Sequence, residues 1–290
     1  MSEQMIKKVL ITGANGFIGG SLMRYYQNQG QDVVGVDLVG NGNDIIEGDI
    51  AQPDSISHVL QECDVIIHTA ALVSNAMQDS DMWRVNVLAT RNLIEAAKEH
   101  KVRRFVQISS VVAYGNSAEG ELDESQPVHA DGGSYVLTKL ASEHVVLGAQ
   151  ANDDIEVVIL RPGDAYGPGS RPWIIAPLEA IAKNQFMLPA KGEGFFRPIY
   201  IDDLVRGIVM ATSHPDAAGE IFNISCEGYM ATKDYFAPHY QWLGKKGPML
   251  VSTKFALRVS GIASKVADLM GNLNEASPST IMQLSTKSWF

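Results

Sequence analysis

Short apolar runs rich in Val and Ile alternate with longer segments of helical period along the first half of the chain. The apolar runs cover residues 7–12, 32–37, 44–49, 64–69, 103–109 and 155–161, and the helical segments cover residues 17–29, 53–61, 80–100 and 134–150. Alternation of this kind is typical of βαβ units, and continuously apolar strands are typical of a sheet that helices cover on both faces. We therefore predict an α/β fold with a doubly wound parallel sheet.

The alternation becomes irregular after Arg161, where Pro and Gly are closely spaced in RPGDAYGPGSRPW. We expect a cofactor-binding domain over residues 1–165, with a sheet that later segments complete. Residues 166–290 are expected to form mainly a smaller substrate-binding or lid region. A chain of 290 residues is long enough for one large domain with a small satellite.

Composition excludes several classes of protein. The formal net charge of −10 and the isoelectric point near 5.1 argue against a nucleic-acid partner. The two cysteines, Cys63 and Cys226, lie far apart and indicate neither a disulfide framework nor a metal site. No signal peptide and no apolar run of about 20 residues is present, so we expect a cytoplasmic protein with no membrane span.

A glycine-rich loop, GANGFIG, follows the first apolar run directly. Gly13, Gly16 and Gly19 are spaced by three residues, and Phe17 and Ile18 open the following helical segment. In such a loop the first glycine allows the tight turn, the second lets the backbone approach a pyrophosphate, and the third lets the helix pack on the strand. The loop therefore predicts dinucleotide binding.

An acidic residue closes the second apolar run. Asp37 lies 24 residues after Gly13, where its carboxylate could accept hydrogen bonds from an adenosine ribose. A 2′-phosphate about 4 Å from this carboxylate would cost between about 2 and about 8 kcal/mol, depending on the effective dielectric constant. The prediction is NAD rather than NADP.

Tyr135 and Lys139 stand four residues apart in a helical segment, so their side chains share one face. Lowering the pKa of a tyrosine from about 10 to about 7 requires roughly 4 kcal/mol. A lysine ammonium about 5 Å away supplies about 3 kcal/mol at an effective dielectric constant of about 20. The charge of an oxidised nicotinamide could supply much of the rest, so the pair is a candidate for proton transfer.

Several motifs in this order resemble one family over nearly the whole chain. They are TGANGFIGG (12–20), HTAA (68–71), RVNV (84–87), ISSVVAYG (108–115), YVLTK (135–139) with Glu143 four residues later, LRPGDAYGPG (160–169) and YIDDL (200–204). The chain resembles the extended short-chain dehydrogenase/reductases, also called NAD-dependent epimerase/dehydratases. Within this family, its sequence most closely resembles the branch that is similar to 3-beta-hydroxysteroid dehydrogenases. The resemblance implies a Rossmann-type sheet and a smaller carboxy-terminal domain that closes over the substrate.

The resemblance also implies catalytic roles for three residues. Tyr135 would be the general acid or base, Lys139 would lower the pKa of Tyr135 and hold the nicotinamide ribose, and Ser110 would hydrogen-bond to the reacting oxygen. A secondary alcohol would lose its proton to the Tyr135 phenolate while its hydride passes to the nicotinamide.

Further residues would contact the cofactor in a protein of this family. The set consists of Gly13, Gly16, Phe17, Ile18, Gly19, Asp37, Asp49, Ile50, Ala70, Ala71, Asn86, Tyr135, Lys139, Pro162 and Gly163. Asp49 resembles the residue that meets the adenine, and Pro162 and Gly163 resemble the loop under the nicotinamide amide. Asn86 could hold the active-site backbone or a water, or make a polar contact between helices. No metal is implied.

The family contains dehydrogenases, which exchange NAD, and nucleotide-sugar epimerases and dehydratases, which recycle a tightly bound NAD. Two departures argue against a nucleotide sugar: Asp164 replaces the usual Asn and would repel a diphosphate, and Arg197 lies outside the usual Arg-Asp spacing. Val111 and Val112 replace the acidic pair of the dehydratases, so dehydration is the least favoured reaction.

We favour an NAD-dependent oxidoreductase that acts on a hydrophobic secondary alcohol or ketone, such as a steroid. A nucleotide-sugar epimerase is the alternative, and a non-catalytic NAD-binding protein is a weaker one. Aromatic and other apolar residues after position 170 would suit a hydrophobic pocket or, equally, the core of the small domain. They are Trp173, Phe186, Met187, Phe195, Phe196 and Tyr229.

The tail carries an apolar stripe of helical spacing formed by Phe255, Val259, Ile262, Val266, Leu269 and Met270. We expect this stripe to pack on the protein, the alternative being contact with a membrane or an oligomeric partner. The family resemblance implies a homodimer built from the helices that carry Asn86 and Tyr135. Relatives usually continue beyond the position of Phe290, which implies a shortened sequence or a reduced tail.

Overall fold

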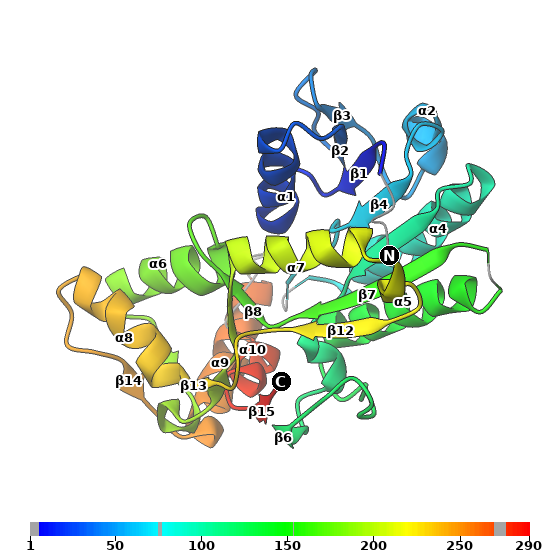
Figure 1. Cartoon of the computed structure of the whole chain (residues 1–290). Coiled ribbons are helices and arrows are strands. Elements are labelled where there is room, and N and C mark those ends of the chain that lie inside the picture. The colour runs from blue at the N-terminus through cyan, green and yellow to red at the C-terminus, as the bar shows by residue number, and fades with distance from the viewer. Residues whose placement is uncertain (1–5, 75–76, 153, 270–276) are drawn as a thin grey trace.

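A seven-stranded parallel sheet forms the centre of the computed structural model, which describes residues 6–74, 77–152, 154–269 and 277–290 (Figure 1). The strands follow the order β12-β7-β5-β4-β1-β2-β3. They are β1 (Val9–Thr12), β2 (Val33–Asp37), β3 (Ile45–Glu47), β4 (Val65–His68), β5 (Arg104–Ile108), β7 (Glu156–Pro162) and β12 (Ile221–Ile224). All six predicted apolar runs lie in this sheet, and the predicted doubly wound α/β fold is confirmed.

The order of the strands creates a switch point at β1. From β1 the chain continues outward to β2 and β3, and then returns to β4 on the other side of β1. In open α/β sheets, ligands bind beyond the carboxyl ends of the strands at such a switch point. The glycine-rich loop follows β1, so the fold carries it to this position.

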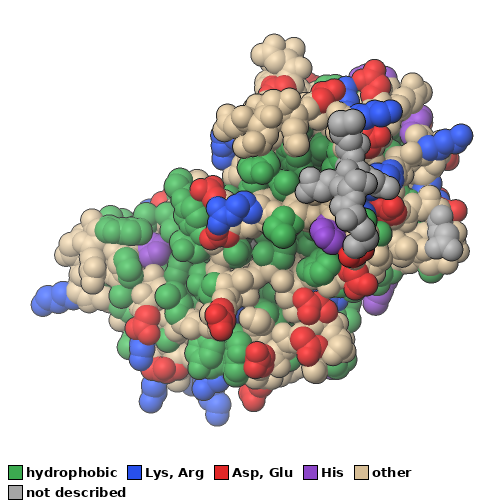
Figure 2. Space-filling view, viewed as in Figure 1, with side chains coloured by type: hydrophobic (Ala, Val, Ile, Leu, Met, Phe, Trp, Pro, Cys, Tyr) green, Lys and Arg blue, Asp and Glu red, His purple; other side chains and the backbone are tan. Residues whose placement is uncertain are grey.

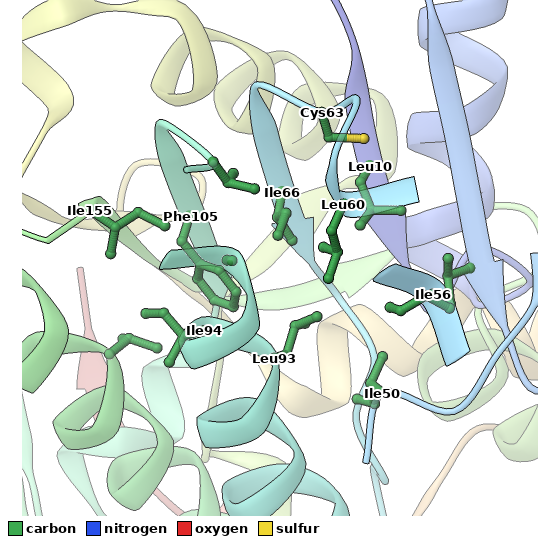
Figure 3. Packing of buried hydrophobic residues seen from close by; sticks show 14 of the residues in the cluster. Leu10, Ile50, Ile56, Leu60, Cys63, Ile66, Leu93, Ile94, Phe105 and Ile155 are labelled. Carbon is green, nitrogen blue, oxygen red and sulfur yellow. The ribbon is translucent and has the colours of Figure 1, made fainter. Parts of the chain in front are cut away.

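Helices cover the two faces of the sheet. The helices of this part are α1 (Phe17–Asn28), α2 (Ser57–Leu60), α3 (Asp79–Trp83), α4 (Ala89–Glu99), α5 (Ser134–Gln150) and α7 (Ile201–Ser213). One core lies between the sheet and α2, α4 and α5, and it includes the packed side chains of Leu60, Leu93 and Phe105 (Figure 3). The other core lies under α1 and α7. Because both faces are covered, the strands are mostly apolar.

The predicted helical segment 80–100 is interrupted. A π-helical turn at Arg84–Leu88 separates α3 from α4, and it contains the buried Asn86. Turns of this type are rare, and they occur frequently at functional sites. A second π-helical turn, at Arg171–Ile175, leads into helix α6 (Ala176–Ala182).

The second half of the chain adds a smaller lobe of helices and short paired strands, seen at the left and bottom of Figure 1. Its other helices are α8 (Thr232–Trp242), α9 (Thr253–Leu269) and α10 (Pro278–Gln283). The strand pairs are β8 (Asp164–Tyr166) with β11 (Pro198–Tyr200), β9 (Met187–Leu188) with β14 (Met249–Leu250), β10 (Phe195–Phe196) with β13 (Met230–Ala231), and β6 (Glu119–Glu121) with β15 (Lys287–Trp289). Strand β12 crosses back and joins the main sheet beside β7.

Aromatic side chains hold the smaller lobe together. Phe196 is buried and stacks on Tyr235 with ring centroids 3.6 Å apart, and Trp173 and Phe186 pack against the same cluster. Phe195 stacks on Tyr229 in a neighbouring contact. Of the two alternatives for these aromatic residues, the structure supports the core for Trp173, Phe186 and Phe196.

The expectation that the apolar stripe of the tail packs on the protein is wrong for Phe255 and Ile262, two of its three described side chains. On α9, Phe255 is 51% exposed and Ile262 is 67% exposed, whereas Ala256 and Ser260 are buried. The helix packs next to α10 and exposes Phe255 and Ile262, whereas Val259 of the stripe is partly buried. The side chains of Val266 and Leu269 and the whole of Met270 lie outside the described residues.

No helix in the described part of the chain is both long enough and apolar enough to cross a bilayer. Among the described residues, no group of three or more His, Cys, Asp or Glu side chains is arranged to hold a metal ion.

Candidate active site

The glycine-rich loop is as tightly packed as its sequence predicts. Gly13 has φ +69°, and a Cβ atom there would lie 2.8 Å from the backbone of Ala70. A Cβ on Gly16 would lie 3.0 Å, and one on Gly19 only 2.2 Å, from the carbonyl oxygen of Gly13. Side chains at these positions would fill the cradle or displace its backbone, so the loop fits a closely bound pyrophosphate.

Helix α1 begins at this loop with its backbone N–H groups open. Gly16 precedes the helix, no side chain caps it, and its first turn carries no acidic residue. The helix dipole and the free N–H groups together favour an anion here. Phe17 and Ile18 in the first turn are partly buried, and they pack against the core under α1 and α7.

Asp37 lies at the carboxyl end of β2, beside the loop. Its Oδ2 accepts a hydrogen bond from the Asn15 backbone N–H at 2.9 Å, and its Oδ1 accepts one from the Leu38 N–H at 2.8 Å. The carboxylate is partly exposed and fixed in orientation. It can therefore accept further hydrogen bonds from ribose hydroxyls.

The residues expected at the adenine end have different exposures. Asp49 is partly exposed and accepts a hydrogen bond from the Ala51 N–H at 2.9 Å. The Ile50 side chain is buried in the core, so only its backbone is available to a ligand. Ala70 and Ala71 follow β4, and the N–H of Ala70 donates to the Thr12 hydroxyl at 3.4 Å.

Helix α5 and the turn after β5 bring the three predicted catalytic residues to one end of the sheet. The Lys139 Nζ atom donates to the carbonyl oxygen of Ile108 at 2.9 Å, and it lies 5.9 Å from the centroid of the Tyr135 ring. Ser110 caps the short turn Val111–Tyr114, and its Oγ accepts a hydrogen bond from the Val112 N–H at 3.3 Å. The side chain of Tyr135 is partly exposed, so its ring can reach a ligand.

Burial opposes ionisation of both members of the pair. It raises the pKa of Tyr135 to about 12, and a hydrogen bond with Ser110 acts in the opposite direction. Burial lowers the pKa of Lys139 to about 8, and the Glu143 carboxylate opposes this. The pKa of Tyr135 therefore stays far from neutrality beside Lys139 alone, and the contribution of the nicotinamide charge stays a prediction. A further positive charge is needed to form the phenolate at neutral pH.

A buried polar network lies behind Lys139. Glu143 accepts two hydrogen bonds from Arg161, from Nε at 3.0 Å and from Nη2 at 2.7 Å, and one from the Ser109 hydroxyl. Arg161 also donates to the hydroxyl of Tyr114 at 3.0 Å. Sequence reasoning assigned no function to Arg161 or Tyr114. A carboxylate on a buried helix face needs a cation beside it. The position of Glu143, one turn after Lys139, therefore indicates that a compensating cation lies nearby.

Asn86 braces the backbone at the edge of the site. Its side-chain oxygen accepts from the Leu72 N–H at 2.8 Å, and its nitrogen donates to the Leu72 carbonyl at 3.0 Å and to the Thr138 hydroxyl at 3.1 Å. Asn86 is 2% exposed. The contacts with Leu72 fit the predicted support of the backbone, and the contact with Thr138 on α5 fits the predicted polar contact between helices.

His68 ends β4 inside the core. Its Nδ1 atom lies 2.7 Å from the Thr12 hydroxyl and its Nε2 atom 2.9 Å from the Thr90 hydroxyl. Complete burial lowers the pKa of His68 to about 3, with the Lys139 charge acting in the same direction. The imidazole is therefore neutral at physiological pH, and it serves as a structural link between β1, β4 and α4.

Pro162 ends β7, and Gly163 follows it and meets the smaller lobe. The N–H of Gly163 donates to the Ile224 carbonyl at 2.9 Å, and a Cβ atom on Gly163 would lie 2.5 Å from the carbonyl oxygen of Arg197. The next residue, Asp164, is buried, and its Oδ2 accepts hydrogen bonds from the Arg197 backbone at 2.9 Å and Nε at 3.2 Å.

This ion pair changes the interpretation of Asp164. The sequence suggested a carboxylate that would repel a diphosphate, but the Arg197 guanidinium offsets its charge. The pair as a whole is neutral, so it neither repels nor attracts an anion strongly. Val111, the first of the two residues in the dehydratase positions, is buried, and no carboxylate adjoins Ser110 there.

The structure thus gathers most of the predicted residues at the carboxyl ends of the parallel strands. The loop glycines and Asp37 lie on the β1–β2 side, and Ser110, Tyr135 and Lys139 lie on the β5 side. The side chains of Ile50 and Asn86 turn into the core instead.

Comparisons with known proteins agree with this arrangement. A model of the family described as "NAD dependent epimerase/dehydratase family" matches residues 9–225. The 3 beta-hydroxysteroid dehydrogenase/Delta 5-->4-isomerase of Mycobacterium tuberculosis is 27% identical over 88% of this chain and 73% of that protein. The UDP-glucose 4-epimerase of Vibrio cholerae is 30% identical over 77% of this chain and 72% of that protein.

A solved structure is similar over a comparable length. The structure of MoeE5 in complex with UDP-glucose and NAD matches with a TM-score of 0.75 and 28% sequence identity. The match covers 84% of this chain and 85% of that chain.

Proposed function

The chain belongs to the NAD-dependent epimerase/dehydratase family, and we propose that it interconverts a secondary alcohol and a ketone on a hydrophobic small molecule. The fold class and the cofactor, NAD, are those of the family. The reaction and the substrate class are proposed, because membership of the family does not specify them.

The residues present fit the cofactor. In this proposal the glycine loop and the first turn of α1 hold the pyrophosphate, Asp37 binds the adenosine ribose, and Lys139 binds the nicotinamide ribose. The support for the loop is steric, because Cβ atoms at Gly13 and Gly19 would lie within 3 Å of neighbouring backbone atoms. When bound, NAD supplies the centre that accepts or returns the hydride.

The protein's own residues handle the proton. Tyr135 exchanges a proton with the substrate oxygen, and Ser110 donates a hydrogen bond to the same oxygen. Because burial keeps Tyr135 protonated, the tyrosine is ready to protonate a carbonyl oxygen in the reductive direction. In the oxidative direction the phenolate is required, and positive charge near the ring stabilises it.

The observation that supports a hydrophobic substrate is the buried ion pair between Asp164 and Arg197. Arg197 lies directly behind Gly163, at the junction of the cofactor region and the smaller lobe. Its guanidinium is bound to Asp164 and also donates to the Thr286 hydroxyl at 3.2 Å, so it offers little free charge to a diphosphate. The alignment with the mycobacterial hydroxysteroid dehydrogenase, which covers 88% of the chain, supports the same class.

A nucleotide-sugar epimerase is the second candidate, and one cation favours it. Arg171 lies in the π-helical turn after β8; its side chain is 70% exposed, and its Nη2 atom lies 3.6 Å from Oε2 of Glu179. This exposed guanidinium could exchange the Glu179 contact for a phosphate. Two similar proteins support this alternative. One is the UDP-glucose 4-epimerase of Vibrio cholerae, and the other is MoeE5, whose structure is a complex with UDP-glucose and NAD.

We also propose a homodimer formed through the helices that carry Asn86 and Tyr135. Trp83, the last residue of α3, and Leu88, the last residue of the π-helical turn, are 41% and 45% exposed, and a partner helix would bury them. Light scattering of the purified protein tests this: a mass of two chains is expected, and a mass of one chain at all concentrations would contradict it.

The nucleotide retained by the purified protein distinguishes the two reactions. The protein is dialysed extensively and denatured, and the released nucleotide is identified by mass. A dehydrogenase that exchanges its cosubstrate is expected to retain little nucleotide and to rebind NAD in preference to NADP. Retention of nearly one NAD per chain would favour the epimerase instead.

A further inference from the structure

Helix α9 presents its apolar face to solvent. Phe255 and Ile262 are seven residues, about 10 Å, apart along the helix and lie on the same side of it. They are 51% and 67% exposed, whereas Ala256 and Ser260, on the opposite side, are buried. Among the described residues, α9 packs mainly on α10, and Leu257 and Val259 are partly buried. Phe255 and Ile262 therefore remain more than half exposed.

Cations line one edge of this apolar face. Lys254 and Arg258 are exposed, and neither forms an ion pair with a residue that the structure describes. With a rotation of 100° per residue, both lie within about a third of a turn of the line through Phe255 and Ile262. We call Lys254, Phe255, Arg258 and Ile262 the α9 surface.

The charge around the α9 surface differs from that of the whole protein. The formal net charge of the chain is −10, yet the segment from residue 235 to residue 267 contains no Asp or Glu. Its charged residues are Lys245, Lys246, Lys254, Arg258 and Lys265. In Figure 2, Lys and Arg side chains project from the left and lower edges of the smaller lobe, with Asp and Glu side chains beside those at the lower edge. The overall charge thus conceals a locally cationic segment, contrary to what the composition suggested.

We propose that the α9 surface docks on an anionic phospholipid bilayer. Exposed Phe and Ile side chains with Lys and Arg along their edge are the combination with which an amphipathic helix lies in a membrane interface. A second copy of the chain is a poorer occupant. A symmetric contact would place the same surface on both partners, and without an acidic residue it would bring cations against cations.

Docking in this way would bring the bilayer close to the candidate active site. Helix α10 packs on α9, and its Ser279 lies against Gly133, the residue that precedes α5 and Tyr135. A hydrophobic substrate dissolved in the bilayer would then have a short path to the site. The docking itself depends only on the α9 surface, and it does not require the proposed reaction.

Co-sedimentation with vesicles tests the proposal on the full-length protein. Vesicles of phosphatidylcholine alone are compared with vesicles that also contain phosphatidylglycerol. We expect binding to the anionic vesicles that weakens as salt is added, and at least about tenfold weaker binding to the neutral ones. Equal binding to both vesicles, or binding to neither, would overturn the proposal.

Two variants locate the contact. The double variant Phe255→Asp with Ile262→Asp removes the apolar part, and Lys254→Gln with Arg258→Gln removes charge while leaving the apolar side chains in place. Both are expected to lower binding to anionic vesicles by at least about tenfold, with unchanged thermal unfolding and NAD affinity. Met210→Asp is the matched control, because Met210 on α7 is also 67% exposed.

Self-association is measured in the same samples. If the wild-type protein forms larger assemblies in sedimentation velocity and the two aspartates abolish them without any binding to lipid, the α9 surface is an interface between copies and the proposal is wrong. Binding to vesicles is read out without substrate. A failure to bind vesicles would therefore overturn the docking proposal and leave the proposed oxidoreductase activity unaffected.

Discussion

Arg161 and Glu143 form a buried, two-pronged ion pair one helical turn beyond Lys139. The two hydrogen bonds measure 3.0 and 2.7 Å, and both side chains are at most 4% exposed. The pair joins β7 to α5, the helix that carries Tyr135 and Lys139. It therefore fixes the catalytic helix relative to the sheet, and its carboxylate favours the charged form of Lys139.

Removing one partner of this pair leaves a buried charge without compensation. The variant Glu143→Gln is expected to lose about 3–5 kcal/mol of the free energy of unfolding, and Arg161→Met a similar amount. The double variant should lose less than the sum of the two. A double-mutant cycle by urea unfolding measures this coupling, and additive losses would show that the two side chains do not depend on each other.

The glycine cradle predicts a selective loss of cofactor binding. In Gly19→Ala the new Cβ atom would lie 2.2 Å from the carbonyl oxygen of Gly13, so the loop must shift. We expect NAD affinity to fall by at least about tenfold, or about 1.4 kcal/mol, in isothermal calorimetry. Gly148→Ala is the control because nothing lies within 4 Å of its Cβ position in α5. It should leave NAD affinity unchanged and should stabilise the helix by up to about 1 kcal/mol.

Tyr135→Phe separates chemistry from binding. The change removes the hydroxyl that exchanges a proton with the substrate and leaves the ring in place. We expect turnover to fall by more than tenfold, about 1.4 kcal/mol in activation free energy, while NAD affinity stays nearly the same. Tyr229→Phe, which changes an exposed tyrosine stacked on Phe195, should retain full activity. A Tyr135→Phe enzyme with more than about a tenth of the wild-type activity would remove Tyr135 from its role.

Burial of His68 predicts how stability depends on pH. Its pKa is about 3 in the folded protein and near 6.5 in the unfolded chain, so the unfolded state binds more protons between these values. The free energy of unfolding therefore falls as the pH is lowered from about 6.5 towards 3. His68→Gln cannot take up this proton and should lose less stability over the same range. Urea midpoints at several pH values measure the difference, and parallel losses in both proteins would contradict the assignment.

The parts of the fold that depend on local sequence were predictable. The six apolar runs identified their strands to within two residues at each end, because a strand that is covered on both faces needs apolar residues throughout. The glycine loop was equally clear, since its geometry depends on Cβ atoms that only glycine lacks. Tyr135 and Lys139 share a helix face as their spacing required.

Features that depend on distant partners were not predictable. Strand β12 joins the sheet from beyond residue 220, and nothing in its own four residues specifies β7 as its neighbour. The sequence shows the negative charge of Asp164, but it does not show that the Arg197 guanidinium lies beside this carboxylate and offsets its charge. Helix α9 has a clear apolar face, but the periodicity of a helix shows which residues share a face and not whether that face meets protein or solvent.

Net oxidation of a hydrophobic alcohol is the most direct test of the central claim. Purified protein is mixed with NAD and a panel of hydrophobic secondary alcohols, including hydroxysteroids, and the absorbance of reduced nicotinamide is followed, with Tyr135→Phe as the blank. The account predicts that at least one alcohol yields many equivalents of reduced cofactor per chain. If no alcohol or ketone changes the cofactor, and the protein instead converts a nucleotide sugar with no net reduction, the proposed reaction is contradicted.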